Sequence, residues 1–267
     1  MAIRVCVAGA TGWTGSAVAS AVLAAEDLRL SGAVARRAAG RDIGEVLGGS
    51  RAGVEVSGSV VEALSAETDV LVDYTSPQAV KGHVQAALER GVRVVVGSSG
   101  LSAKDYAEIE AMAQANGASV IAAGNFSITA ALAKHFALLA ARYLPSWEIV
   151  DYASAGKVDA PSGTVQELAE QLGEVHQPVI DVPIKNVVGL AGARGQSVAG
   201  SQVHSIRLPS YVIAFETIFG LPDERLTIRH DAGSGAEPYV AGTLLAVRKA
   251  MEVQGLVRGL DRLLFDA

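Results

Sequence analysis

The feature that most constrains the fold is a glycine-rich turn close to the N-terminus. An apolar run over Ile3–Ala10 leads into GATGWTG at residues 9–15, and a helical pattern over Ser16–Ala25 follows. In such a strand–turn–helix unit the glycines allow a tight turn, close approach of a pyrophosphate and close packing of helix on strand. The helix N-terminus then offers N–H groups to the phosphates. The pattern predicts a dinucleotide site, and a plain glycine-rich turn is the alternative.

The rest of the first half alternates strands and helices. The predicted strands are nearly continuous in apolar residues, which is typical of strands covered on both faces. This repetition predicts an α/β fold with a Rossmann-type, doubly wound parallel sheet. The predicted strands are Leu28–Ala35, Asp69–Thr75, Arg93–Gly97 and Ser119–Ala123, and the predicted helices are Pro77–Arg90 and Ala103–Ala115.

The pattern changes after residue 125 and predicts a second domain of the α+β type, with a mostly antiparallel sheet. We assign residues 1–125 and 239–267 to the dinucleotide-binding domain and residues 126–238 to a substrate and oligomerisation domain. Residues 181–202 have no clear period and are predicted as part strand, part mobile loop. The expected elements are helices Ile128–Leu144, Val165–Val175 and Tyr239–Val253, strand Glu148–Ala153, and three strands at hairpin spacing, Val203–Leu208, Val212–Phe219 and Arg225–His230.

Composition excludes several classes of function. The 267 residues carry a net charge of −6, which gives no electrostatic case for nucleic acid or an anionic membrane. A single cysteine, Cys6, rules out a disulfide framework, and the histidines lack ligand spacing, so no metal is predicted. Every long apolar window is interrupted by charge, and no targeting segment is visible. A cytoplasmic protein is therefore expected.

The end of the second predicted strand bears on the choice of nicotinamide cofactor. An acidic residue there would bind the adenosine ribose of NADH and repel a 2′-phosphate. Here the strand runs into Arg36 and Arg37, and the first acid is Asp42. Two guanidinium groups suit a 2′-phosphate, so NADPH is favoured over NADH. A solvated basic loop is the alternative.

Two further loops follow predicted strands at the carboxyl edge of the sheet, where ligands bind in this architecture. They are YTSP at 74–77 and GSSG at 97–100. Their small hydroxyl residues and glycines would let backbone approach the nicotinamide ribose, and Thr75 is our candidate in the first loop. Ordinary turns are an equally good explanation.

The segment KVDAPSGT at 157–164 is the candidate substrate site. Thr164 and Glu167 match a capping box, which predicts that a helix starts here. The amides of Gly163 and Thr164, with the charge of Lys157, would then bind a small carboxylate. A lysine beside a bound imine can also donate a proton to nitrogen as hydride reaches carbon. A capped surface helix with a solvated lysine is the alternative.

These motifs, in order along the chain, resemble the dihydrodipicolinate reductases, also called 4-hydroxy-tetrahydrodipicolinate reductases, of lysine and diaminopimelate synthesis. The segments that carry the resemblance are GATGWTG at 9–15, VGSSGL at 96–101, AGNFS at 123–127, KVDAPSGT at 157–164 and VHSIRLP at 203–209. The resemblance implies an oxidoreductase with a Rossmann domain, a substrate domain and a last helix that returns to the first domain. It also implies a homotetramer assembled through the substrate-domain sheets.

The resemblance assigns roles to residues of this chain. It implies that Lys157 is the proton donor and that Gly163 and Thr164 contact a substrate carboxylate, with Ser154 and Ser162 as further substrate-side candidates. The implied pyrophosphate residues are Gly9, Thr11, Gly12, Trp13 and Thr14, and those at the nicotinamide end are Gly97, Ser98, Ser99, Ala123, Gly124, Asn125 and Phe126.

The chain departs from the family in its substrate half. Members usually carry a His-His-x-x-Lys run, whereas Ala153 and Ser154 precede Lys157 here. The usual Ser-Arg after the last substrate-domain strand reads Ser234-Gly235, and Trp13 replaces a common basic residue. We therefore favour a divergent paralogue that reduces another small carboxylated imine or unsaturated acid with NADPH. The family's lysine-pathway reaction and a non-catalytic NADPH sensor are the alternatives.

Overall fold

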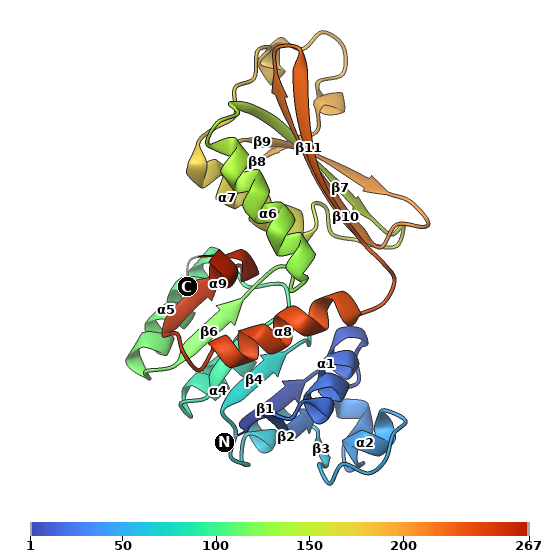
Figure 1. The fold of residues 1–267 in the computed structure, drawn as a ribbon, viewed down its shortest axis with the longest axis vertical. Coiled ribbons are helices and arrows are strands. Elements are labelled where there is room, and N and C mark those ends of the chain that lie inside the picture. Colours follow the sequence, from blue (N-terminus) through green and yellow to red (C-terminus); the bar gives the residue numbers. More distant parts are fainter. Residues whose placement is uncertain (1, 266–267) are drawn as a thin grey trace. The chain divides into compact units, whose positions relative to one another are not determined.

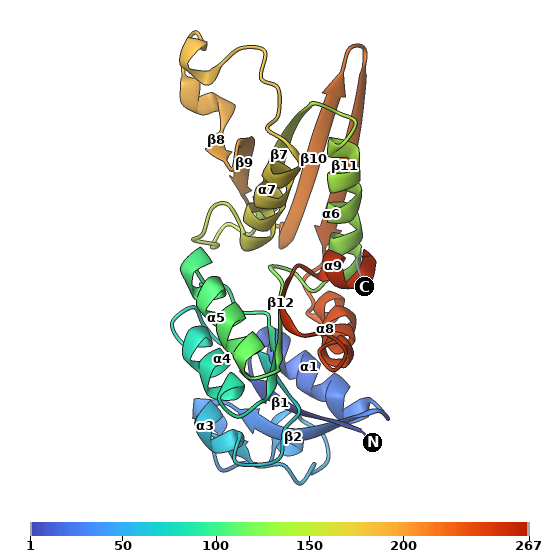
Figure 2. The same ribbon diagram turned by 90° about the vertical axis from the view of Figure 1, so that its left-hand side faces the viewer.

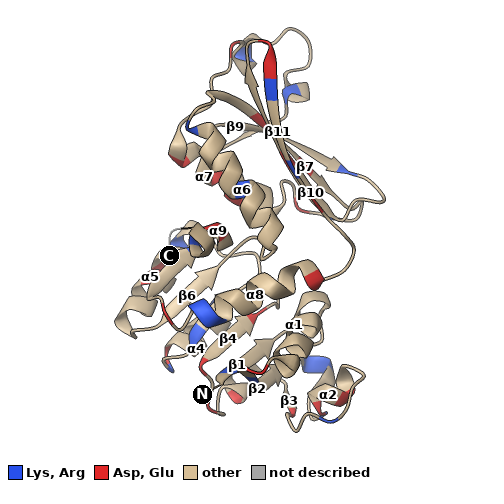
Figure 3. Ribbon diagram, viewed as in Figure 1, with Lys and Arg blue, Asp and Glu red and all other residues tan. Residues whose placement is uncertain are grey.

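The structure is a computed structural model that describes residues 2–265. It forms two compact units (Figure 1). The first combines the residues up to Ile128 with those from Ala236 onward, and the second spans Thr129–Gly235. Lys and Arg residues are interspersed with Asp and Glu residues over many elements (Figure 3). Among the described residues no helix is long and apolar enough to cross a membrane, and no acidic, histidine and cysteine side chains cluster as metal ligands.

The first unit is built on a seven-stranded parallel sheet of order β12-β6-β5-β4-β1-β2-β3. The order reverses between β1 and β4, so a crevice forms at the carboxyl ends of these strands. The predicted Rossmann sheet is confirmed. The strands are β1 (Ile3–Ala8), β2 (Leu28–Val34), β3 (Val56–Ser57), β4 (Val70–Asp73), β5 (Arg93–Val96), β6 (Ser119–Ala122) and β12 (Gly255–Arg258).

Helices cover both faces of this sheet, as a doubly wound fold requires. Figure 2 shows α4 and α5 on one side and α1 and α8 on the other. Cys6, Leu71 and Val94 pack beneath α4 and α5, and burial raises the pKa of the Cys6 thiol to about 12. The helices are α1 (Trp13–Ala24), α2 (Ile43–Val46), α3 (Val60–Ala63), α4 (Val80–Leu88), α5 (Ala103–Ala115), α8 (Glu237–Lys249) and α9 (Leu260–Phe265), with a 3₁₀ turn at Arg36–Ala38.

The second unit packs α6 (Ile128–Ala141) and α7 (Gly163–Val175) on one face of a five-stranded sheet of order β11-β10-β7-β9-β8. Neighbouring strands are antiparallel except for β7 and β9, so the predicted mostly antiparallel sheet is confirmed. The strands are β7 (Ser146–Ala153), β8 (Gln196–Val198), β9 (Ser201–Arg207), β10 (Ile213–Leu221) and β11 (Glu224–Ala232).

The local pattern misplaced some elements. Of the three strands predicted at hairpin spacing, only β10 and β11 pair as a hairpin, because β7 lies between β9 and β10 and takes the central place with its buried Trp147 and Ile149. The strand β9 forms its hairpin with β8 instead. Residues 181–202 contain two short 3₁₀ turns, Ile184–Asn186 and Ala191–Arg194, before β8. The sequence prediction also missed β12 and α9, which complete the first unit after α8. Pairing with β6, which no local period reports, creates β12.

Two glycines of the N-terminal turn are required by space. Gly9 has φ +82°, and a Cβ there would lie 2.2 Å from the carbonyl oxygen of Tyr74. A Cβ on Gly15 would lie 2.0 Å from the carbonyl oxygen of Gly9. Backbone atoms in a packed turn cannot retreat from such contacts as a flexible side chain could. The start of α1 therefore sits directly on the turn.

We expect Gly15→Ala to lower the free energy of unfolding by more than about 2 kcal/mol, since overpacking against backbone typically costs 1–3 kcal/mol. It should also weaken dinucleotide binding, because the turn must shift. The matched control is Gly82→Ala inside α4, where an added Cβ meets open space. That variant should gain up to about 1 kcal/mol. Chemical denaturation of both variants measures the difference, and equal stabilities would contradict the assigned role of Gly15.

Candidate cofactor and substrate sites

The N-terminus of α1 is the candidate pyrophosphate site. Gly12 occupies the N-cap, no side chain within residues 2–265 caps the helix, and its first turn holds no acid. The Gly12 amide donates to the Gly9 carbonyl at 2.8 Å, which closes the turn. The N–H groups of the first turn thus remain for an anion, which the positive end of the helix dipole favours. The turn fits a dinucleotide pyrophosphate, because Gly9 and Gly15 let the backbone close where a Cβ would meet a carbonyl oxygen, which leaves the helix N-terminus open to an anion.

A pocket of about 350 Å³ opens beside this turn. It brings together three of the five segments that the sequence assigned to a cofactor, at the carboxyl ends of β1, β4 and β5. Thr11 and Gly124 are exposed, whereas Phe126 is buried and packs edge-on against Tyr74 at 6.2 Å between ring centroids. The pocket is lined by Gly12, Trp13, Thr14, Tyr74, Thr75, Ser76, Pro77, Gly97, Ser98 and Ser99.

Asp73, which the sequence analysis missed, ties two of these segments together. It is fully buried at the end of β4, and its Oδ1 accepts hydrogen bonds from the Thr75 hydroxyl at 2.8 Å and the Ser98 hydroxyl at 2.5 Å. Its Oδ2 lies 2.7 Å from Nδ1 of His83. Burial alone would raise the pKa of Asp73, but the hydrogen bonds from His83, Ser98 and Thr75 hold it below its usual value. The sequence did carry a signal for Asp73, since it is an acidic residue that ends an apolar strand at the carboxyl edge of the parallel sheet, where ligands bind.

Arg36 and Arg37 are exposed on the 3₁₀ turn that directly follows β2. Neither guanidinium makes a hydrogen bond or ion pair with another of the residues that the structure describes. The next acid, Asp42, is committed elsewhere, because its carboxylate accepts the amides of Ala52 and Gly53 at 2.8 and 2.7 Å. These backbone hydrogen bonds lower the pKa of Asp42. Two unneutralised guanidinium groups therefore stand where an acid would favour NADH.

In the second unit, the predicted capping box is wrong. Ser162, not Thr164, is the N-cap of α7, and its hydroxyl oxygen accepts the Val165 amide at 3.4 Å. Thr164 is buried within the first turn, and Glu167 forms an ion pair with Lys134 of α6. An N-cap residue needs extended backbone, and Ser162 has it with ψ 154°. The helix nevertheless starts in the predicted segment, with Gly163 exposed at its first position.

Two of the predicted substrate-side groups have partners inside the protein. The Ser162 amide and hydroxyl donate to the buried Asp151 at 2.9 and 2.7 Å, so Ser162 organises the turn rather than offering donors to a ligand. Nζ of Lys157 lies 2.8 Å from Oδ1 of Asp159, with 27% of the lysine side chain exposed. Burial opposes ionisation of Asp159, but the hydrogen bond from Lys157 keeps the pKa of Asp159 below its usual value. Ser154 is exposed, and its carbonyl accepts the Lys157 amide.

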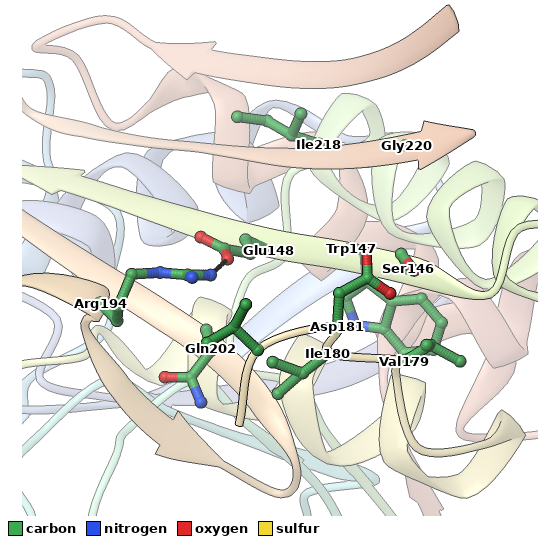
Figure 4. Close-up of a pocket in the computed structure, with 11 residues that line it drawn as sticks. Ser146, Trp147, Glu148, Val179, Ile180, Asp181, Arg194, Gln202, Ile218 and Gly220 are labelled. Atoms are coloured by element: carbon green, nitrogen blue, oxygen red, sulfur yellow. Dashed lines mark hydrogen bonds and ion pairs between the residues drawn. The ribbon is translucent and has the colours of Figure 1, made fainter. Parts of the chain in front are cut away.

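A second pocket, of about 380 Å³, lies on the second unit between β7, β9, β10 and the chain at 179–182 (Figure 4). Glu148 points across it to form an ion pair with Arg194, and its other oxygen lies 2.7 Å from Nε2 of His204. None of the residues that the sequence assigned to a site lines this pocket. The 157–164 loop therefore stays the candidate substrate site that the sequence predicts.

The chain was compared with known families, proteins and structures. The profile "Dihydrodipicolinate reductase, N-terminus" matches residues 3–126, and "Dihydrodipicolinate reductase, C-terminus" matches residues 126–264. The 4-hydroxy-tetrahydrodipicolinate reductase of Desulfitobacterium hafniense is 41% identical over 264 residues, covering 98% of each chain. The enzyme of that name from Mycolicibacterium smegmatis is 38% identical, covering 98% of this chain and 99% of the relative.

Solved structures agree with these matches. A dipicolinate-bound dihydrodipicolinate reductase from Paenisporosarcina sp. TG-14 has a TM-score of 0.79 at 30% identity, covering 98% of this chain and all of the other. An amine dehydrogenase from Mycobacterium smegmatis has a TM-score of 0.64 at 18% identity, covering 97% and 95%, which shows a shared fold. The fold and these matches define an NAD(P)H-dependent oxidoreductase. More narrowly, the chain belongs to the dihydrodipicolinate reductase family, as the sequence motifs indicated.

The depressed pKa of Asp73 gives a prediction about pH. The folded state holds the ionised carboxylate, so this stabilisation is present above the unfolded pKa and is lost as pH falls through the lower folded pKa. We expect Asp73→Asn to lower the free energy of unfolding by about 3 kcal/mol at pH 7. The difference from wild type should shrink below about pH 4. Urea titrations at both pH values measure it, with Asp27→Asn, at an exposed ion pair, as the control. A deficit that does not depend on pH would contradict this account.

Proposed function

We propose that this protein is a 4-hydroxy-tetrahydrodipicolinate reductase that uses NADPH. The observation that carries the proposal is the match over 98% of the chain, at 41% identity, to a relative of that name. The intact 157–164 segment supports it, since a lysine and a helix N-terminus suit a carboxylated imine. This places the lysine-pathway reaction ahead of the divergent paralogue that the missing histidines had favoured.

In this proposal the first unit binds the cofactor. The N-terminus of α1 holds the pyrophosphate, Arg36 and Arg37 hold the 2′-phosphate, and the loops around Thr75 and Ser98 receive the nicotinamide ribose. A bound nicotinamide cofactor supplies the hydride. Asp73 keeps the two loops in place through its hydrogen bonds to both hydroxyls. Gly97 lets its loop pack closely against the Tyr74 ring, because a Cβ at residue 97 would lie 2.1 Å from that ring.

The second unit binds the substrate in this proposal. Gly163 and Thr164 at the N-terminus of the 13-residue helix α7 receive a carboxylate, favoured by the helix dipole. Loss of the 4-hydroxyl group as water leaves a C=C bond conjugated to the imine. The Lys157 ammonium then donates a proton to the nitrogen as hydride reaches the far carbon of this conjugated system, so one hydride and one proton reduce one double bond. Asp159, 2.8 Å from Nζ, holds the Lys157 ammonium in place before the substrate arrives.

One observation favours a second candidate, the reduction of a different small carboxylated imine. Position 153 is a fully buried alanine and Ser154 is an exposed serine, where family members usually carry histidines. Neither side chain supplies an acid or a second cation. A panel of cyclic imino acids alongside 4-hydroxy-tetrahydrodipicolinate separates the two candidates by their kcat/KM values.

A homotetramer remains a proposal that the family resemblance supports. Ile149 of β7 packs in the core beneath α6 and α7, so Val150 points to the other face of the sheet, where it is partly exposed. Ile206 and Ile218 of the neighbouring strands are also partly exposed on that face. Sedimentation of the intact protein tests this assembly, and a monomer would contradict it.

For the cofactor, we expect NADPH to bind at least about tenfold more tightly than NADH, since each charge-assisted hydrogen bond contributes roughly 1.5–3 kcal/mol. The double variant R36A/R37A should lose this preference while keeping its affinity for NADH. Arg29→Ala, at the other end of β2, is the matched control and should behave as wild type. Calorimetric titration of both cofactors gives the affinities. Equal affinities of the wild-type protein for NADPH and NADH would contradict the proposed 2′-phosphate site.

For catalysis, we expect Lys157→Met to reduce kcat about a hundredfold or more, because a general acid typically contributes 10²–10⁴. NADPH affinity should stay unchanged. Lys185→Met, an exposed lysine of the same unit, is the control. Turnover is followed by NADPH absorbance. Wild-type protein that binds NADPH but reduces none of the imines would contradict the enzyme assignment and favour a sensor, and full activity in Lys157→Met would refute the role of Lys157.

A further inference from the structure

A buried carboxylate lies beneath the 157–164 loop. Asp151 of β7 is fully buried, and it gathers donors from two parts of the chain. From the loop, Ser162 donates through its amide and its hydroxyl, at 2.9 and 2.7 Å. From β9, the Ser205 hydroxyl donates at 3.2 Å and Nη2 of Arg207 at 2.7 Å. Asp151 thus joins the start of α7 to the sheet.

Arg207 holds the other end of the same turn. Its Nη2 also donates to the main-chain carbonyl of Asp159 at 2.8 Å, and its Nη1 donates to the carbonyl of Ile206 at 2.9 Å. Only 16% of its side chain is exposed. The Asp151–Arg207 pair therefore fixes the main chain at both Asp159 and Ser162.

The fixed turn bears on the proposed chemistry at both of its ends. Asp159, whose carbonyl Arg207 holds, places its carboxylate 2.8 Å from Nζ of Lys157. At the other end, Ser162 is the N-cap from which Gly163 and Thr164 begin α7. The proposed proton donor and the proposed carboxylate contact are thus both set by one buried ion pair that touches neither the substrate nor the cofactor in our assignment.

The cost of burying two charges indicates that this pair holds the loop in position rather than stabilising the fold. Burying two charges costs desolvation, and apolar residues of similar volume often stabilise a fold as well or better. A guanidinium offers several donors in a fixed fork, which can hold a carboxylate and a carbonyl at once. The Asp151–Arg207 pair links a strand to a loop on both sides of a turn. Apolar side chains in its place could not hold the loop at two points.

We propose that Asp151 and Arg207 are positioning residues that hold the Lys157–Thr164 loop in its reactive geometry. This inference rests on the proposed function, since the loop is the proposed substrate site. Small displacements of reacting groups are costly, and a shift of about 1 Å can reduce a rate a hundredfold. Loosening the pair should therefore affect the substrate and the chemical step while sparing the cofactor.

The test is Arg207→Lys, which keeps a positive charge beside Asp151 but replaces the fork with a single ammonium. We expect kcat to fall about tenfold or more and the Kd for pyridine-2,6-dicarboxylate to rise, with the NADPH Kd unchanged. Amide hydrogen exchange over residues 155–164 should become faster, while β10 keeps its protection. The control is Arg229→Lys, whose arginine forms a bidentate ion pair with Asp231 at 2.7 and 2.7 Å away from the loop and should show wild-type values.

The possible outcomes are distinct. Wild-type kcat, dicarboxylate affinity and exchange in Arg207→Lys would overturn the positioning role. If that variant does not fold, Ser162→Ala removes one arm of the same connection without exposing a buried charge, and wild-type kcat with wild-type loop exchange in it would overturn the proposal. A wild-type protein that turns over no imine refutes the proposed function instead. Faster loop exchange in Arg207→Lys would then still support the link between the pair and the loop.

Discussion

The close contact between Gly15 and the carbonyl of Gly9 is the constraint on which the first unit depends. Because no side chain separates them, α1 begins directly at the end of β1 and directs its first amides at the space above the sheet. The positive φ of Gly9 lets the chain pass beneath the carbonyl of Tyr74, so the turn also meets the loop after β4. The candidate cofactor pocket thus depends first on the backbone packing of this turn.

Each unit then uses a buried aspartate near the carboxyl end of a strand to organise its loops. Asp73 ends β4 and holds Thr75 and Ser98, whereas Asp151 lies two residues from the end of β7 and holds Ser162. Buried carboxylates are expensive unless every oxygen is satisfied, and in both cases hydroxyl, amide or cationic donors satisfy them. The loops that carry the candidate chemistry are therefore held by hydrogen bonds to fixed points of the sheets, not by their own apolar packing.

The family assignment and the roles of individual residues in the substrate half rest on different observations. Family membership rests on motifs and on matches over the whole chain, and it survives the absence of the histidines before Lys157. What those positions do in this chain depends on local geometry. Ala153 is the register neighbour of Arg207 on adjacent parallel strands, so a buried methyl group stands beside the residue whose guanidinium holds the loop. In the proposed mechanism, the chemistry of the substrate half accordingly depends on Lys157 and on the contacts that hold it.

The sequence by itself determined the parallel sheet, the glycine-rich turn, the arginines after β2 and the segment in which α7 begins, because each follows from short-range periodicity, glycine conformation or the residues themselves. It misassigned the N-cap of α7, which is Ser162 and not Thr164. Only the tertiary structure decided the strand order of the second unit, the pairing of β12 with β6 and the partners of Asp73 and Asp151. These depend on groups that are far apart in sequence, such as Asp151 and Arg207. A local pattern can place an acid in an apolar strand, but it cannot say which distant donor will satisfy that acid. Ser162 shows the same limit, since its motif predicted a ligand contact and a buried carboxylate took its donors instead.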